Sequence, residues 1–317
     1  MNRRQILAGL ASAPAGMLAL APARGTAQAA VPVIGVMVIS DEHFTPPQFD
    51  QAMQERGWRP GSYRLDVKFA QGKVDRLDAL ARELVAAKVN AIVALYTPSA
   101  LAAKRVTGTI PIVMSVGDPV GNGIVSNVTR PEGNITGIDS AAASLSGKRL
   151  EVLREAVPSL RRLGVFINPP DPFSKSLVGQ VRAVASKVDV SVEVIPALDL
   201  DQAMRDAAAS RVEGLVVQPS LPQRPIAERL LRARLPGVSG ERSFIEAGGL
   251  LSVNSSAMER YRAIALYIDR ILKGAVPRDL PILQANQFDI LVNRGTAKAF
   301  GLTLPQLLLS RAEEIVD

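Results

Sequence analysis

The sequence alternates short apolar runs with amphipathic helical patterns, and this alternation is typical of a parallel sheet wrapped by helices. The first apolar run, VIGVMVI at 33–39, is dominated by β-branched residues, as expected of a strand buried on both faces. Apolar residues at 74–88 then fall on one stripe of a predicted helix. The chain is therefore predicted to be an α/β protein.

The pattern runs through the chain twice, with a Gly-, Pro- and Asn-rich stretch at 117–137 between the two passes. We predict this stretch to be a loop. Further strands are predicted at 65–69, 91–95, 110–116, 163–167, 190–195, 214–218, 237–239, 250–253 and 288–292. Helices are predicted at 47–56, 97–104, 146–157, 175–187, 201–210, 226–233 and 256–273. The pattern indicates two α/β lobes in tandem, closed by the last helix and strand.

In open parallel sheets a ligand lies beyond the carboxyl ends of the strands, so residues that directly follow strands are the candidate binding residues. Two facing lobes of this kind would form a cleft. The candidates are Ser40 and His43 after the first strand, Thr97 and Ser99, Asp118, Asn168, Gln218 and Ser220, and Gly240 with Glu241.

Thr97 and Ser99 allow two interpretations, because their hydroxyls could cap a helix or bind a ligand carboxylate at the helix N-terminus. Asp118 precedes a proline, so it could be a turn residue or an acceptor for a ligand ammonium group. Together, these positions predict a site for an amino-acid-like zwitterion, in which both charges are compensated.

Asn168 and His43 are similarly open to two interpretations. Asn168 precedes two prolines and could form a turn or offer its amide to a ligand. His43 is the only histidine, and it could line the cleft or be solvated. Without a second His or a Cys it predicts no metal site.

The motifs of the common enzyme classes are absent from the sequence. There is no Gly-x-Ser-x-Gly elbow and no partner for His43 in a serine triad. No Gly-x-Gly-x-x-Gly follows the first strand, and no Gly-Lys-Ser/Thr motif binds phosphate. We therefore expect no catalytic residues, no cofactor and no enzymatic activity.

The N-terminal residues resemble an export signal. Arg3 and Arg4 precede an uncharged stretch at 8–23, and the small-x-small triplet Ala-Gln-Ala follows at 27–29. We expect cleavage after Ala29 and a location in the bacterial periplasm. The paired arginines favour the twin-arginine route over general secretion, although Asn2 and Ile6 depart from the usual pattern.

Cysteine content and charge exclude several other classes. The chain has no cysteine, so neither a disulfide framework nor a lipid-accepting thiol is predicted. Loss of residues 1–29 would reduce the formal charge from +7 to +4, because the segment carries three arginines and no acid. The remaining Lys and Arg are scattered among acids, which disfavours nucleic-acid binding. A transcriptional repressor with two such lobes would also need an N-terminal DNA-binding motif.

Several stretches, in order along the chain, resemble the solute-binding proteins of ATP-binding-cassette importers, in the family that includes the tryptophan-binding TrpX type. These stretches are IPIV at 110–113, GDPVG at 117–121, RPEGNITG at 130–137, GKRLEVL at 147–153, FIEAGGLLS at 244–252, YIDRILKG at 267–274 and NRGTAKAFGL at 293–302.

The resemblance implies a type 1 periplasmic binding protein fold with two Rossmann-like lobes joined by three hinge crossings. The first lobe would comprise 31–139 and 252–277, and the second 140–251 and 278–317. It also implies a monomer that captures an amino acid or a related small polar solute and delivers it to a membrane permease. A ligand-sensing protein without a transport role is the alternative, and an α/β enzyme is the remaining one.

Overall fold

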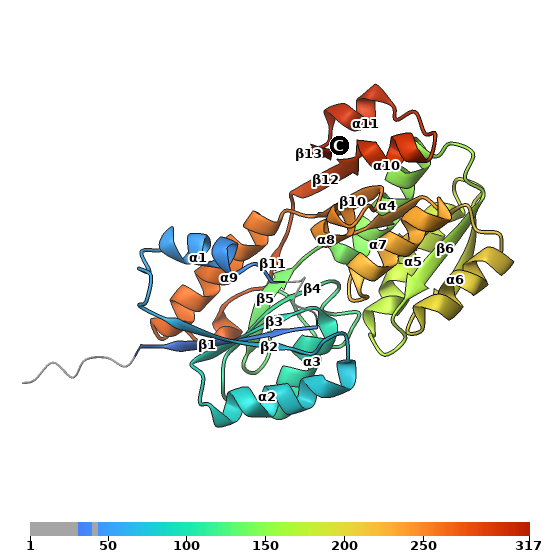
Figure 1. Ribbon diagram of the computed structural model, residues 1–317. Helices are drawn as coiled ribbons and strands as arrows, with labels where there is room; N and C mark the ends of the chain where they lie inside the picture. The colour runs from blue at the N-terminus through green and yellow to red at the C-terminus, as the bar shows by residue number, and fades with distance from the viewer. Residues whose placement is uncertain (1–30, 40–43) are drawn as a thin grey trace, which may run out of the picture. The chain divides into compact units, whose positions relative to one another are not determined.

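Two sheets, each covered by helices on both faces, form the part of the chain that this computed structural model describes, residues 31–39 and 44–317 (Figure 1). Residues 31–317 make one compact unit, and the two lobes described below both lie within it. The predicted export signal at 1–29 lies outside the described residues. None of the helices in the described ranges has the length and apolar character needed to cross a membrane.

The first lobe is built on a sheet of six strands within the described residues, in the spatial order β11-β5-β4-β3-β1-β2. All recorded strand pairs in this sheet are parallel. Its strands are β1 (Val33–Val38), β2 (Arg64–Phe69), β3 (Ala91–Leu95), β4 (Ile112–Val116), β5 (Ile135–Asp139) and β11 (Leu283–Gln284). Its helices are α1 (Pro46–Gln54), α2 (Leu77–Ala86), α3 (Thr97–Val106) and α9 (Ala257–Leu272), with 3₁₀ turns at Val74–Arg76 and Pro277–Asp279.

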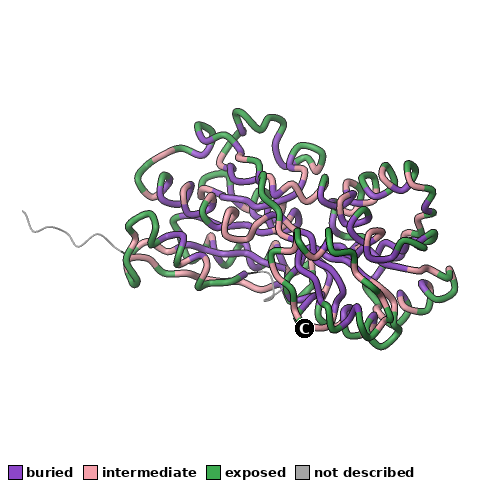
Figure 2. Tube along the Cα trace, turned by 90° about the horizontal axis from the view of Figure 1, so that it is seen from above, coloured by how far each residue is buried: buried purple, intermediate pink, exposed green. Residues whose placement is uncertain are grey.

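Strand β1 is apolar throughout because both of its faces are covered. Val36 and Val38 point to the side of α1 and α9 and belong to a core with Phe49. Met37 points to the opposite side, where it packs in a core with the α2 residue Leu84. Figure 2 shows the resulting buried segments along the strands, with exposed positions on the outer helices and loops.

The second lobe contains a sheet of seven strands in the described part of the chain, in the order β13-β12-β10-β9-β8-β6-β7. Strand β12 runs antiparallel to β10, and the other recorded pairs are parallel. Its strands are β6 (Arg162–Ile167), β7 (Ser191–Pro196), β8 (Gly214–Val217), β9 (Gly237–Ser239), β10 (Leu251–Ser255), β12 (Phe288–Asn293) and β13 (Glu314–Val316). Its helices are α4 (Ala142–Ala156), α5 (Phe173–Ala185), α6 (Leu200–Ala209), α7 (Gln223–Ala233), α8 (Arg242–Glu246), α10 (Arg294–Ala299) and α11 (Gln306–Ser310).

In the described ranges, the chain passes between the lobes three times: after β5, after β10 and after β11. The predicted lobe bounds differ from the sheet membership at two of these passages. Residues 252–255 were predicted to belong to the first lobe. They lie in strand β10, which pairs with β9 and β12 of the second sheet. Strand β11 pairs with β5 of the first sheet, although 278–317 was predicted to lie in the second lobe.

Strand β5 was predicted to be mostly loop, since 117–137 is rich in turn-forming residues. Gly137 lies inside the strand with φ +143, and a Cβ atom there would lie 2.0 Å from the Met114 carbonyl oxygen. Only glycine permits this close approach of the two backbones. The glycine that suggested a loop is therefore what allows β5 to pair with β4.

Candidate functional site

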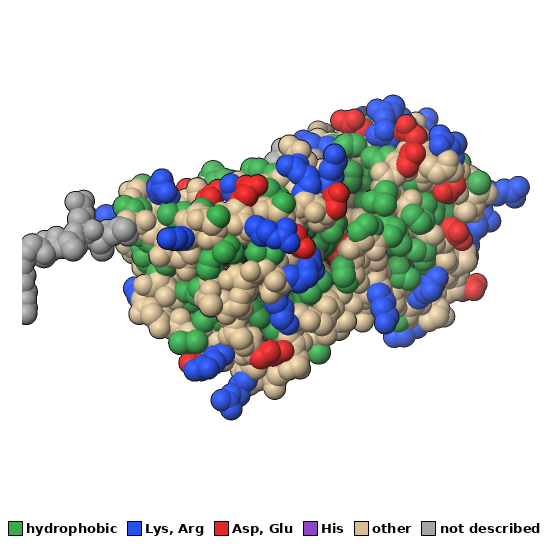
Figure 3. Space-filling view, turned by 90° about the horizontal axis from the view of Figure 1, so that it is seen from below, with side chains coloured by type: hydrophobic (Ala, Val, Ile, Leu, Met, Phe, Trp, Pro, Cys, Tyr) green, Lys and Arg blue, Asp and Glu red, His purple; other side chains and the backbone are tan. Residues whose placement is uncertain are grey.

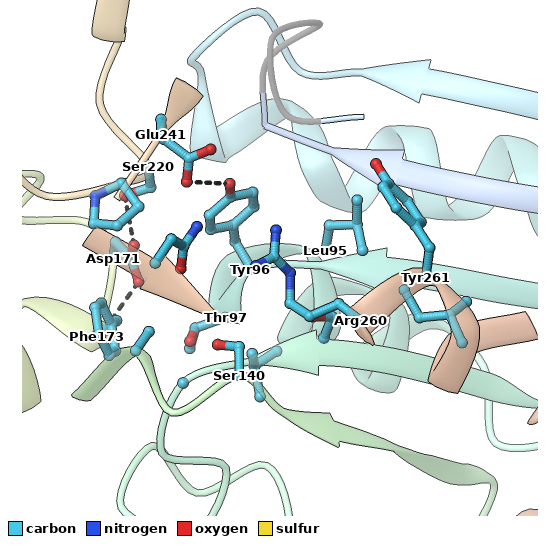
Figure 4. Close-up of a pocket in the computed structure, with 17 residues that line it drawn as sticks. Leu95, Tyr96, Thr97, Ser140, Asp171, Phe173, Ser220, Glu241, Arg260 and Tyr261 are labelled. Atoms are coloured by element: carbon cyan, nitrogen blue, oxygen red, sulfur yellow. Dashed lines mark hydrogen bonds between the residues drawn. The ribbon is translucent and has the colours of Figure 1, made fainter. Parts of the chain in front are cut away.

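A cavity lies at the carboxyl ends of strands from both sheets (Figure 4). The lining residues are Leu95, Tyr96, Thr97, Ser115, Val116, Gly117, Ser140, Ala142, Asp171, Phe173, Pro219, Ser220, Glu241, Asn254, Arg260, Tyr261 and Ile264. Both lobes therefore contribute to one site.

Asp171, in the turn between β6 and α5, places a buried carboxylate at this cavity. Only 2% of the residue is exposed. Its Oδ1 accepts a hydrogen bond from the Phe173 backbone N–H (3.0 Å), and its Oδ2 accepts from the Ser220 hydroxyl (2.6 Å) and the Gln218 amide (2.8 Å). Burial raises the pKa of the Asp171 carboxyl, against the opposing effect of these hydrogen bonds. No Lys or Arg of the described residues forms an ion pair with it, so its charge lacks a cationic partner.

Two helices present their N-termini to the same side of the cavity. Helix α3 begins at Thr97, and helix α4 begins at Ala142, directly after Ser140 and Ala141. Neither N-cap residue caps its helix through its own side chain, and neither first turn contains an acidic residue, but Asp139 Oδ1 accepts from the Ala141 backbone N–H at 2.9 Å just before α4. Helix N-termini with free N–H groups attract anions, so this wall favours a negative group. Figure 4 shows Thr97 and Ser140 side by side, with Asp171 and Phe173 next to them.

Tyr96 and Glu241 connect the lobes through the cavity. The Tyr96 hydroxyl donates to Glu241 Oε1 at 2.7 Å. Burial, followed by the charge of Glu241, raises the pKa of Tyr96 well above its usual value, which keeps the hydroxyl protonated as a donor. Tyr96 has φ +68 and ψ 154, a backbone conformation that is almost confined to glycine. Strain of this kind costs about 1–3 kcal/mol and is concentrated at functional sites.

Behind the second-lobe wall, Arg149 supplies a buried positive charge. The residue is 0% exposed, and its Nε donates to the Val253 carbonyl at 3.0 Å. Burial lowers the pKa of the guanidinium to about 10, while Glu241 and Tyr96 act in the opposite direction. The guanidinium therefore stays charged at neutral pH and offsets the negative charge of Glu241.

The remaining side of the cavity is largely apolar, with one cation. Leu95, Ile264 and the ring of Tyr261 line it, and the Tyr261 hydroxyl accepts from the Thr45 backbone N–H at 2.8 Å. Arg260 donates through Nη1 to the carbonyl and, at 2.9 Å, to the hydroxyl of Ser255. In Figure 4, Arg260, Leu95 and Tyr261 lie across the cavity from Asp171.

Of the predicted binding residues, Thr97, Ser220 and Glu241 line the cavity. Ser40 and His43 lie outside the described residues. Ser99 is fully buried and is not part of the lining, and its hydroxyl has no hydrogen-bond partner. The alternative that Thr97 or Ser99 caps helix α3 is wrong, because Tyr96 occupies the N-cap without a side-chain hydrogen bond.

Three further predicted residues lie beside or behind the cavity. Asp118 is absent from the lining, and its carboxylate accepts from the Gly121 N–H and the Ser176 hydroxyl, which favours the turn interpretation. Asn168 also lies in a turn, where its carbonyl accepts from the Asp171 N–H at 2.9 Å. Gln218 is fully buried and supports Asp171 from behind.

The prediction included Glu241 among the residues that follow strands, and it missed Tyr96, Asp171 and Arg260. Asp171 lies three positions after Asn168 in the same turn after a strand, so the rule that selects residues at strand ends could have included it. Arg260 comes from the helix that returns to the first lobe, and no local pattern places it at the cavity. In the described ranges, no group of three or more His, Cys, Asp or Glu could hold a metal ion.

Comparisons with known proteins agree with this architecture. The model of the family described as ABC transporter substrate binding protein matches residues 48–316. This is a family of solute-binding proteins and not of enzymes. A relative from Clostridioides difficile (strain R20291), named tyrosine-binding protein, is 27% identical over 267 residues, which cover 80% of this chain and 75% of that protein.

Solved structures of low sequence identity share the fold. The ABC domain from Streptococcus pneumonia in complex with L-Trp has a TM-score of 0.79 at 21% identity, covering 90% of this chain and 99% of that one. A leucine binding protein from Thermotoga maritima has a TM-score of 0.53 at 14% identity and covers 78% of this chain and 77% of that one. The predicted fold class, that of type 1 periplasmic binding proteins, is confirmed.

Proposed function

The chain belongs to the ABC transporter substrate binding protein family, and on that premise we propose that its cavity binds a free amino acid with an aromatic side chain. The observation that carries the proposal is Asp171, a buried carboxylate at the cavity wall beside two helix N-termini. A zwitterion needs compensation of both charges when it leaves water, and this wall supplies both kinds of partner.

In the proposed complex, the ammonium group of the ligand meets Asp171 and the carboxylate meets the starts of α3 and α4 at Thr97 and Ser140. The sequence predicts that the ammonium group binds Asp118. The proposal moves it to Asp171, because Asp171 lines the cavity and Asp118 does not. Ser220 and Gln218 hold the Asp171 carboxylate in place from the second lobe. The second lobe thus recognises the ammonium and the first lobe the carboxylate.

The side chain of the ligand would occupy the opposite side, between Leu95, Ile264 and the rings of Tyr96 and Tyr261. These surfaces suit a large flat apolar group, and Arg260 can stack on an aromatic ring or meet a polar tip. The names of two similar proteins, a tyrosine-binding protein and a complex with L-Trp, direct the choice of first ligands to test.

Isothermal titration calorimetry with L-tyrosine, L-tryptophan, L-leucine and L-lysine tests the proposal. We expect saturable binding of L-tyrosine, L-tryptophan or both, and weaker binding of L-leucine and L-lysine. The matched analogues of tyrosine are tyramine, which lacks the carboxylate, and 3-(4-hydroxyphenyl)propionate, which lacks the ammonium group. Tight binding of the second analogue would contradict the role of Asp171, and failure of every amino acid to bind would contradict the ligand class.

We further propose that the protein works in the periplasm as a monomer and delivers its ligand to an ABC permease. Arg3, Arg4 and the triplet at 27–29 support export with cleavage after Ala29. On the face that Figure 3 shows, basic and acidic side chains are interspersed, which supports a small solute as ligand over nucleic acid. N-terminal sequencing of periplasmic protein tests the cleavage, and R3K/R4K, which should block twin-arginine export, tests the route.

Uptake of radiolabelled amino acid separates transport from the alternative, ligand sensing. Cells that lack the protein should lose high-affinity uptake of the amino acid that the purified protein binds. Restoring the wild-type chain should restore uptake, whereas the variant Asp171→Asn should not. Unchanged uptake in cells without the protein, together with tight binding in vitro, would favour the sensing role.

A further inference from the structure

Beside the ligand cavity, the turn after β4 of the first lobe contacts the start of α5 of the second lobe. Asp118 Oδ2 accepts a hydrogen bond from the Ser176 hydroxyl at 2.5 Å. Neither residue lines the cavity. The bond therefore joins the two lobes at a place where no ligand in the cavity would touch it.

The first-lobe side of this contact is held in place by its own turn. Asp118 has φ +52, and its Oδ1 accepts from the Gly121 backbone N–H at 2.9 Å. The Asp118 carbonyl accepts from the backbone N–H of Asn122 at 3.0 Å and from its side-chain amide at 2.9 Å. Because the turn fixes the carboxylate within the first lobe, little additional order is needed when Ser176 approaches.

The lobes also meet at the backbone of Gly117. A Cβ atom at this position would lie 2.7 Å from the Phe173 ring and 2.9 Å from the Ala142 Cβ. Both neighbours belong to helices of the second lobe, and apart from the adjacent residues Val116 and Asp118 no first-lobe atom comes as close. The missing side chain therefore matters for the contact between the lobes and not for the packing of the first lobe.

We propose that Gly117 and Asp118 of the first lobe and Phe173 and Ser176 of the second form a clasp that holds the lobes closed over the ligand. Asp118 acts in it as a positioning residue that does not touch the ligand. The inference rests on the proposed function, since it assumes that the cavity binds and releases a solute.

The clasp contributes free energy only to the closed arrangement, because opening separates Asp118 from Ser176. A contact made in one of two conformations shifts their populations by its own free energy, whatever ligand is bound. Loss of the clasp should therefore accelerate ligand release and enlarge the open population. Because neither Asp118 nor Ser176 lines the cavity, removing the bond between them leaves the lining residues, Gly117 and Phe173 included, in place.

Ser176→Ala tests the clasp, with Ser186→Ala as the matched control at the other end of α5, where the serine hydroxyl bonds only within its own helix. We expect the dissociation rate of L-tyrosine, measured by stopped-flow fluorescence, to rise about tenfold in Ser176→Ala. The association rate and the rate in Ser186→Ala should stay near those of the wild type. Equal dissociation rates in Ser176→Ala and Ser186→Ala would overturn the proposal.

Distances between the lobes give a readout that does not depend on the ligand. The chain has no cysteine, so Arg82→Cys and Lys187→Cys place spin labels at one exposed position in each lobe. Double electron–electron resonance should show a larger open population in Ser176→Ala than in Ser186→Ala, with and without L-tyrosine. Gly117→Val, which inserts a side chain between the lobes, should shift the distances further in the same direction.

The two proposals fail in different ways. If none of the amino acids tested by calorimetry binds but Ser176→Ala still enlarges the open population, the clasp stands and the ligand class is wrong. If L-tyrosine binds but neither Ser176→Ala nor Gly117→Val changes the distances, the ligand class stands and the clasp is overturned.

Discussion

Two turns, one after β4 in the first lobe and one after β6 in the second, each carry an aspartate close to the same cavity. Asp118 is half-buried, and its carboxylate bonds to a backbone N–H of its own turn and to a serine of the other lobe. Asp171 is only 2% exposed, bonds entirely within its own lobe and lines the cavity. The two residues have the same chemistry but different surroundings.

The difference shows what makes a carboxylate a candidate ligand-binding group. Burying a charge without a cationic partner is costly, and an arriving ammonium group recovers part of that cost. Asp171 fits this description. The Asp118 carboxylate does not, because it lies outside the cavity lining, is only half-buried and already accepts two hydrogen bonds. We therefore assign recognition to Asp171 and closure to Asp118.

The substitution Asp171→Asn should have the largest effect on binding. A buried ammonium group would lose its charged partner, which should weaken binding of an aromatic amino acid by about 2–5 kcal/mol. Calorimetry at neutral pH measures this loss, and circular dichroism checks that the variant is folded. Asparagine keeps only one acceptor oxygen, which can face either the Phe173 N–H or Ser220 and Gln218, so part of the hydrogen bonding that holds the turn is also lost.

Asp118→Asn is the matched variant in the other turn. Because Asp118 does not touch the ligand, we expect a weaker effect, about tenfold or less, that comes from the clasp. A larger loss of affinity in Asp118→Asn than in Asp171→Asn would reverse the assignment of the two aspartates.

Tyr96→Phe should have the next largest effect. It keeps the ring in the cavity and removes the bond to Glu241, and hydrogen bonds to charged groups contribute about 1.5–3 kcal/mol. We expect weaker binding and less compaction on ligand addition, as measured by small-angle scattering. Tyr261→Phe is the control, because the Tyr261 hydroxyl bonds within the first lobe. Equal compaction in both variants would show that Tyr96 does not couple the lobes.

Affinity should also fall in acid because of Asp171. Its pKa in the folded protein lies above the usual value, so the carboxyl takes up a proton as the pH falls through that raised pKa. Once it is neutral, affinity should drop by up to about tenfold per pH unit. The stability of the ligand-free protein should change in the opposite sense, since burial of the ionised form is unfavourable above that pKa and is relieved below it.

Titrations of the wild type and Asp171→Asn between pH 7 and the acid range separate this effect from other carboxylates. The difference between the two proteins isolates Asp171, both in affinity and in the free energy of unfolding from urea denaturation. A wild-type affinity that declines in parallel with that of Asp171→Asn would exclude Asp171 as the titrating group.

Most of the fold could be predicted from the sequence, because long apolar runs and helical stripes carry the signal. Strand β3 begins and ends where predicted, at Ala91 and Leu95. The strands that the sequence does not predict are very short or contain residues typical of loops. Strand β11 has two residues and β13 three, too few to show a period, and Gly137, which lets β5 pair with β4, is a residue type that indicates a loop.

The site could be predicted only as a region, since a pattern in the sequence places a residue at a strand end but does not show which way it faces. Thr97 and Ser99 illustrate this, because they lie two positions apart on one helix turn and only Thr97 lines the cavity. On α9, Arg260 lines the cavity, whereas Arg262 pairs with Glu55 on the surface. Such choices depend on how the lobes pack, which involves residues far apart in the sequence.

The smallest expected effect on ligand affinity comes from removing the hydroxyls of Thr97 and Ser99 in α3. It tests how the first lobe binds the ligand carboxylate. Thr97→Val keeps the shape of the side chain and removes a hydroxyl at the cavity, so binding should weaken by about 0.5–1.5 kcal/mol. Ser99→Ala removes a buried hydroxyl that has no partner, so affinity should not change and the protein should be as stable or slightly more stable.

Calorimetry and thermal melts of Thr97→Val and Ser99→Ala decide between the two positions. Weaker binding in Ser99→Ala would mean that its hydroxyl turns toward the ligand when the ligand binds, and that the carboxylate lies deeper along the N-terminus of α3 than we propose. Unchanged binding in Thr97→Val would leave the carboxylate to the backbone N–H groups of α3 and α4. The first lobe would then recognise its half of the ligand through the main chain, and the second lobe through the side chain of Asp171.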